Sequence, residues 1–101
     1  MREYNLELEF KPLASKFLNK CDKILLKRIY LKLELLKSNS FPSDCKRIEN
    51  REEKIFRVRV GDYRIIYSVA LDKIFIADID KRSNIYKLNE EKEEYISSLI
   101  H

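Results

Sequence analysis

Residues 56–67 read Phe-Arg-Val-Arg-Val-Gly-Asp-Tyr-Arg-Ile-Ile-Tyr, and this stretch decides the fold. Two runs that alternate apolar and polar residues flank the pair Gly61-Asp62, which is typical of a two-residue hairpin turn of type I′ or II′. Such a turn predicts the register of the two strands. The apolar cross-strand pairs on one face are then Val60 with Tyr63, Val58 with Ile65, and Phe56 with Tyr67.

The opposite face of this hairpin is basic. The same register places Arg59 directly across from Arg64, with Arg57 two residues further along its strand. Like charges that face each other on a ladder destabilise it by up to about 1 kcal/mol. Two explanations remain open at this point: the three guanidinium groups bind an anion, or they meet carboxylates from elsewhere in the fold.

The composition indicates one basic domain covering residues 1–101. The chain has 21 Lys and Arg against 17 Asp and Glu, a formal charge of +4 and a pI near 9.1, which suits a polyanionic partner. Cys21 and Cys45 have neither the spacing of a metal site nor the density of a secreted scaffold, which predicts free thiols and a cytoplasmic protein. We expect no signal peptide and no membrane span.

The order of the elements predicts an α+β fold. Alternation at 4–10 predicts an N-terminal strand, and a helical hairpin follows, with one helix from Pro12 and a second from about Asp22 to Lys37. After a loop at 38–44 we expect an antiparallel sheet of three to four strands: a short edge strand within 45–50, the central hairpin, and an apolar strand at 74–79. Asn89 predicts the cap of a C-terminal helix.

The second helix carries two apolar stripes. One stripe consists of Leu25, Ile29, Leu33 and Leu36, widened by Leu26 and Tyr30, and it is expected to cover the sheet. The other consists of Ile24, Leu31 and Leu35. Packing of this second stripe against the first helix is the preferred explanation, and a groove for a partner protein is the alternative.

Two motifs resemble a known family. The pattern aromatic-Arg-x-Arg-x-Gly-x-Tyr-Arg-x-x-Tyr at 56–67 resembles the central hairpin of the RelE/ParE toxin superfamily, and the basic segment from Lys81-Arg82 to Tyr86 resembles the one that follows the last strand in that family. Their order and separation make the resemblance specific, and it covers nearly the whole chain. It implies the microbial ribonuclease-like fold and a toxin neutralised by a small acidic, RelB-like antitoxin.

The resemblance also implies an activity and a set of site residues. Relatives of the RelE type are ribosome-dependent endoribonucleases that cleave mRNA in the decoding site without a metal or cofactor, so the implied partners are the ribosome and mRNA. The implied catalytic residues are Arg64, Arg82 and Tyr86. The implied RNA-binding residues are Arg57, Arg59, Lys54 and Lys81.

The chain departs from the family pattern at three points. Arginines stand at 57 and 59, where active nucleases of the family can have lysines, and arginine does not give up a proton near neutral pH. The tight turn at Gly61-Asp62 changes the offset between Arg59 and Arg64. Asp80 stands where many relatives have a Gly-His pair, so the general base is either Tyr86 or Asp80.

Other chemistries receive little support. His101 is the single histidine and ends the chain, and a metal cluster of Asp72, Asp78 and Asp80 is not expected because Asp72 falls in a turn at the far end of the strand. Two alternatives to the nuclease remain: a ParE-like inhibitor that acts by binding DNA gyrase, and an inactive relative that binds nucleic acid.

Overall fold

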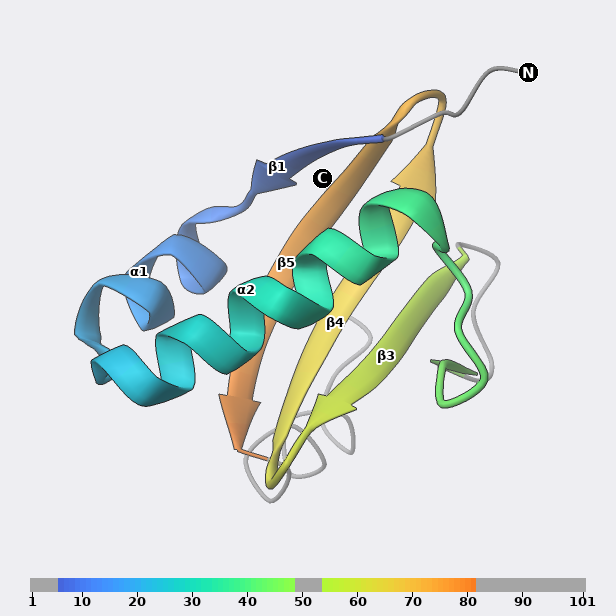
Figure 1. Cartoon of the computed structure of the whole chain (residues 1–101). Helices are drawn as coiled ribbons and strands as arrows, with labels where there is room; N and C mark the ends of the chain where they lie inside the picture. Colours follow the sequence, from blue (N-terminus) through green and yellow to red (C-terminus); the bar gives the residue numbers. More distant parts are fainter. Residues whose placement is uncertain (1–5, 49–53, 82–101) are drawn as a thin grey trace.

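The structure, a computed structural model, describes residues 6–48 and 54–81. Two helices and five strands follow one another along these residues (Figure 1). Their order is β1 (Glu7–Phe10), α1 (Pro12–Lys20), α2 (Lys23–Ser38), β2 (Lys46–Arg47), β3 (Ile55–Val60), β4 (Tyr63–Ala70) and β5 (Lys73–Lys81). The predicted α+β class is confirmed, and the predicted C-terminal helix lies outside the described residues.

The strands form a single mixed sheet in the order β1-β5-β4-β3-β2. Strands β2 to β5 pair antiparallel, as expected from the hairpin turns. Strand β1 joins the other edge and pairs parallel with β5, with Leu8 beside Ile74. The three interior strands are therefore β5, β4 and β3, and the interior position of β5 explains its continuous apolar run.

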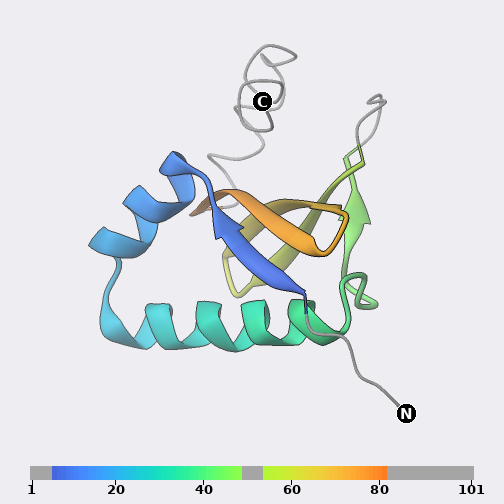
Figure 2. The same cartoon turned by 90° about the horizontal axis from the view of Figure 1, so that it is seen from above.

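Helix α2 lies across one face of this sheet and closes the main core (Figure 2). It begins at the N-cap Asp22, whose side chain accepts a hydrogen bond of 2.8 Å from the backbone N–H of Leu25. The predicted inner stripe of Leu25, Ile29, Leu33 and Leu36 is buried against the sheet. Within the described ranges, no helix is both long and apolar enough to cross a lipid bilayer.

The second stripe of α2 does not pack against the first helix. Ile24 is 77% exposed, Leu31 65% and Leu35 43%. The preferred explanation, packing within the helical hairpin, is therefore wrong. The inner stripe is the side of α2 that is buried against the sheet, and the outer stripe remains at the surface.

The turns explain the register. Gly61 has φ of +61° and Asp62 has negative φ, the combination expected in a type II′ turn. A β-bulge opposite Ile66 and Tyr67 inserts Ala77 as an extra residue in β5. The bulge lets Ile76 and Ile79 both face the core, and it moves Asp78 and Asp80 to the opposite face.

Candidate nucleic-acid interface

The sheet face that points away from the core carries three arginines, and we call it the arginine face. The predicted register is confirmed: Val58 pairs with Ile65 toward the core, and Arg59 pairs with Arg64 on the arginine face. Arg57, two residues from Arg59, shares that face because side chains alternate along a strand.

Two cross-strand rows organise the arginine face. The first row runs Arg59, Arg64 and Asp80 across β3, β4 and β5. The second row runs from β2 to β5 and contains Lys46, Arg57, Ile66 and Asp78. Both rows thus have cations on β3 and a carboxylate on β5.

Arg64 occupies the centre of the first row and is 8% exposed. Its Nη1 donates hydrogen bonds to the backbone oxygens of Gly61, at 3.4 Å, and Tyr63, at 3.2 Å. Among the described residues, the Arg64 side chain makes only these two hydrogen bonds, and both acceptors are neutral carbonyl oxygens. Their length makes them weak, so the guanidinium can exchange them for stronger, charge-assisted bonds to an anion.

Asp78 and Asp80 supply acidic groups on the arginine face. Asp78 is buried, and its Oδ1 accepts a bond of 2.8 Å from the N–H of Ile79; Asp80 Oδ1 likewise accepts one of 2.7 Å from Lys81 N–H. The two strands of the hairpin contain no acid, and these carboxylates come from β5. Asp80, one of the two candidates for the general base, therefore lies beside Arg64 in the sheet.

Asp44, in the loop before β2, forms an ion pair with α2. Its Oδ2 lies 2.9 Å from Nζ of Lys32. Burial by itself would raise the pKa of Asp44, but the hydrogen bond and charge of Lys32, with the backbone bonds, outweigh burial and lower the pKa.

The predicted site residues divide into three groups. Arg57, Arg59 and Arg64 lie together on the arginine face. Lys81 pairs with Tyr63, so its register position belongs to the core face at the end of β5, and Lys54 is exposed just before β3. Arg82 and Tyr86 lie outside the described residues. Lys46, which the motif did not single out as a site residue, stands directly beside Arg57.

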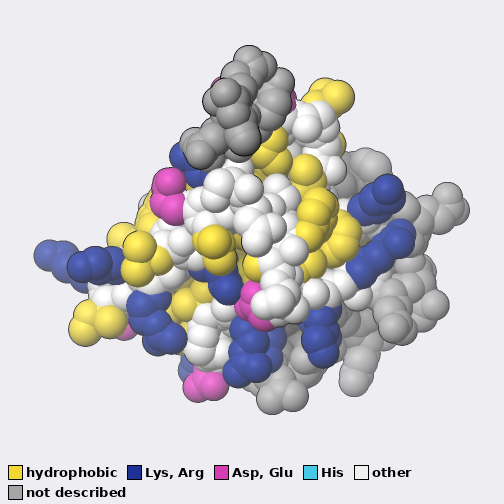
Figure 3. All heavy atoms as spheres, turned by 45° about the vertical axis from the view of Figure 1, so that its right-hand side comes forward, with side chains coloured by type: hydrophobic (Ala, Val, Ile, Leu, Met, Phe, Trp, Pro, Cys, Tyr) yellow, Lys and Arg dark blue, Asp and Glu magenta, His cyan; other side chains and the backbone are white. Residues whose placement is uncertain are grey.

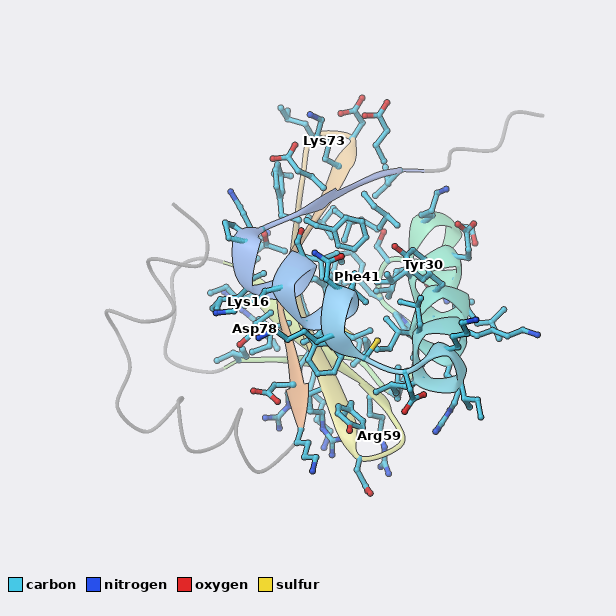
Figure 4. The ribbon with its side chains drawn as sticks, turned by 90° about the vertical axis from the view of Figure 1, so that its left-hand side faces the viewer. Lys16, Tyr30, Phe41, Arg59, Lys73 and Asp78 are labelled. Carbon is cyan, nitrogen blue, oxygen red and sulfur yellow. The ribbon has the colours of Figure 1, made fainter. Side chains whose placement is uncertain are left out.

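A hollow of about 550 Å³ opens beside the first row, between α1 and the ends of β4 and β5. Lys16 and Lys20 of α1 line it, as do Asp78 and Asp80 of β5. Figure 4 shows Lys16 and Asp78 on this side of the molecule, Arg59 near the hairpin end of the sheet and Lys73 at the opposite end. The hollow thus brings cations of α1 near the acidic end of the rows.

Tyr67 belongs to the core and not to this face. Its side chain is fully buried, and its hydroxyl donates a hydrogen bond of 2.6 Å to the backbone oxygen of Ser40. Burial, with smaller contributions from Cys45 and Asp44, raises the pKa of Tyr67 far above its ordinary value. Both cysteines are free thiols, as predicted, and the described residues contain no group of three potential metal ligands.

Comparison with known proteins identifies the family. Residues 8–86 match the profile of the family described as ParE toxin of type II toxin-antitoxin system, parDE. This match covers most of the chain. The protein is a member of the RelE/ParE toxin superfamily.

Three proteins similar to this toxin carry the name RelE. A candidate toxin named RelE1 from Methanocaldococcus jannaschii is 37% identical over 67 residues, which are 61% of this chain and 73% of the relative. The RelE–RelB complex from Pyrococcus horikoshii OT3 contains a similar chain, with 25% identity and a TM-score of 0.68, covering 77% of this chain and 96% of that one. The RelB–RelE antitoxin–toxin complex from Methanococcus jannaschii gives 28% identity and a TM-score of 0.62, with coverages of 77% and 94%. The resemblance stated from the two motifs is confirmed, and the protein is a type II toxin of the RelE family.

Proposed function

We propose that this toxin is an endoribonuclease that cleaves mRNA bound to the ribosome, without a metal ion. One observation carries the proposal: Arg59, Arg64 and Asp80 form a single row on the arginine face. Two guanidinium groups next to a carboxylate combine anion binding with a group that accepts a proton. An inhibitor that acts only by binding gyrase does not need that combination.

The proposed reaction uses the RNA's own 2′-hydroxyl as the nucleophile. The 2′-oxygen forms a bond to the adjacent phosphorus while the bond from phosphorus to the 5′-oxygen breaks. A base takes the proton of the 2′-hydroxyl, and an acid supplies a proton to the departing 5′-oxygen. The products are a 2′,3′-cyclic phosphate and a free 5′-hydroxyl.

Arg64 is suited to stabilise the negative charge that develops on the phosphate. Its two carbonyl hydrogen bonds are long, and a phosphate that enters beside the exposed Arg59 replaces them with stronger ones. A well-placed donor of this kind contributes on the order of 10²–10³ in rate. Arg57 and Lys46 in the second row extend the contact to neighbouring phosphates.

Proton transfer falls to Asp80 or Tyr86. Asp80 neighbours Arg64 in the sheet, which supports its role as the general base. Tyr86 and Arg82 enter through the family resemblance, with Tyr86 as the alternative base or the acid and Arg82 as a phosphate clamp. General acid–base catalysis contributes roughly 10²–10⁴ in rate.

We also propose a small acidic antitoxin as the partner that neutralises this toxin. The similar chains from Pyrococcus horikoshii OT3 and Methanococcus jannaschii were solved as complexes with RelB. The net charge of +4 and the cations of the arginine face favour an acidic partner. We expect the toxin to stop the growth of cells that express it, and we expect an acidic antitoxin encoded beside it to restore that growth when both are expressed.

Single-turnover cleavage of ribosome-bound mRNA tests the nuclease. Arg64→Ala and Asp80→Asn should each slow cleavage by about 100-fold or more. Lys73→Ala, at the opposite end of the sheet, should leave the rate unchanged. Because Arg64 is buried, the exposed Arg59→Ala provides a second variant that should weaken RNA binding without affecting folding.

Pulse labelling of cells that express the toxin separates the two modes of toxicity. Prompt loss of methionine incorporation is the result expected of an mRNA nuclease. DNA breaks and a damage response while translation continues would contradict the nuclease and point to gyrase.

A further inference from the structure

The outer side of α2 carries an apolar stripe that nothing in the described structure covers. Ile24, Leu31 and Leu35 are 77%, 65% and 43% exposed, and we call them the outer stripe. Spacings of seven and four residues place them in one line along about 16 Å of helix. Figure 3 shows hydrophobic side chains reaching the surface between groups of Lys and Arg. Contiguous exposed apolar side chains rimmed by polar ones mark interaction sites.

Cations flank the outer stripe. Lys27 and Arg28 lie between Ile24 and Leu31 along the helix, and both are exposed, as is Lys23 at the helix start. The single acid of α2, Glu34, lies 3.5 Å from Lys37, which neutralises part of its charge. The surface around the stripe is therefore both apolar and positive.

We propose that the outer stripe is the docking surface for an acidic amphipathic helix of the antitoxin. This inference rests on the proposed function, which supplies the partner, and adds where and how that partner binds. A helix laid along α2 presents apolar side chains at spacings of three and four residues, which match the positions of Ile24, Leu31 and Leu35. Acidic residues beside those positions would meet Lys27 and Arg28.

Charge disfavours a second copy of this chain as the occupant. In a two-fold symmetric dimer the same surface lies on both sides of the interface, so α2 would pack against α2. Lys27 and Arg28 would then face the equivalent cations across the interface. Glu34 is the single acid of α2, so the helix has little negative charge to offset this repulsion. An acidic helix avoids this repulsion and gains attraction from the same side chains.

The docking surface also lies apart from the arginine face. Helix α2 packs on the core side of the sheet (Figure 2), whereas the register places Arg57, Arg59 and Arg64 on the other face. An antitoxin helix on α2 would therefore leave the arginine face uncovered unless another antitoxin segment reaches it. The outer stripe accordingly serves affinity, and its loss should not change RNA cleavage by the free toxin.

Titration of the full-length toxin with the full-length acidic antitoxin encoded beside it tests the proposal. The double variant Leu31→Ala, Leu35→Ala should raise Kd by at least about tenfold, since two partly exposed leucines lose their contacts on binding. Leu71→Ala is the matched control, because Leu71 is 99% exposed in the turn between β4 and β5. Lys27→Glu should slow association and reduce its dependence on salt.

The possible outcomes separate this inference from the proposed function. Unchanged Kd in the double variant, with wild-type toxin binding tightly, would overturn the docking surface and leave the antitoxin partner intact. Failure of the wild-type toxin to bind would contradict the partner itself. If sedimentation shows a toxin dimer that the double variant dissociates while antitoxin affinity stays the same, the occupant is a second copy and the proposal is wrong.

Discussion

Arg59 and Arg64 face each other directly on neighbouring strands, on the side of the sheet away from the core. Charges of the same sign at this separation repel, and one of the two is almost fully buried. The core that α2 closes packs on the other face, although Ile55 and Ile66 are also buried on this one. Asp80, next in the same row, offsets part of the repulsion. This arrangement supports the proposed binding of a phosphate at the arginine face.

The repulsion between these arginines predicts that Arg59 lowers the stability of the fold while it strengthens RNA binding. Arg59→Thr should raise the free energy of unfolding by a few tenths to about 1 kcal/mol, because it removes a like-charge pair and suits a strand. The same variant should bind RNA more weakly, with a shallower dependence on salt. Urea denaturation and a salt series check the two effects. Lys81→Thr, whose register position belongs to the core face, should weaken RNA binding less, and equal losses would argue against the arginine face.

The ion pair of Lys32 with Asp44 should make stability depend on pH. The pKa of Asp44 is lowered in the folded state, so its contribution is present above the unfolded pKa of about 3.9 and is lost as pH falls through the lower folded pKa. Asp44→Asn should cost roughly 0.5–1 kcal/mol at pH 7, the range for partly exposed pairs. Urea denaturation at pH 7 and at pH 3 measures this. A cost that stays the same at both values would show that charge is not its cause.

Gly61 should resist substitution for two separable reasons. Its φ of +61° disfavours any side chain, and a Cβ built there would lie 2.8 Å from Nη2 of Arg28. Gly61→Ala should therefore lower the free energy of unfolding by about 1–2 kcal/mol. A double-mutant cycle with Arg28→Ala isolates the contact, because removing the guanidinium relieves it and leaves the backbone cost. If the effects of the two substitutions on the free energy of unfolding are additive, the contact with Arg28 contributes nothing to the cost, because the Arg28 side chain can move away from the new methyl group.

Tyr67→Phe should lower the stability of the fold and leave the rate of mRNA cleavage unchanged. The substitution removes the hydrogen bond of 2.6 Å to the Ser40 oxygen and should cost about 1–2 kcal/mol in the free energy of unfolding. Cleavage of ribosome-bound mRNA by the folded variant should match wild type, since Tyr67 lies in the core. It therefore serves as the control for Tyr86→Phe, the variant that tests whether Tyr86 transfers a proton and that should slow cleavage if it does. Slow cleavage by folded Tyr67→Phe would contradict the placement of Tyr67 outside the site.

Much of this protein follows from local sequence patterns. Alternation around Gly61-Asp62 determines the hairpin register, since side chains on a strand alternate and a two-residue turn permits one alignment. The pairing of Arg59 with Arg64, the start of α1 at Pro12 and the inner stripe of α2 follow for similar local reasons. The two motifs also indicated the toxin superfamily, which the family match confirms.

Only the tertiary structure decided which strands meet and which apolar side chains remain outside. Parallel pairing of β1 with β5 joins residues more than sixty positions apart, and no local pattern specifies such a contact. The bulge at Ala77 puts Asp78 and Asp80 beside the arginines, because one extra residue exchanges the faces of all residues after it. The outer stripe of α2 looked like a packing surface in the sequence. It stays exposed because α2 touches the sheet along one side only, and an apolar stripe is the same in sequence whether this chain or a partner covers it.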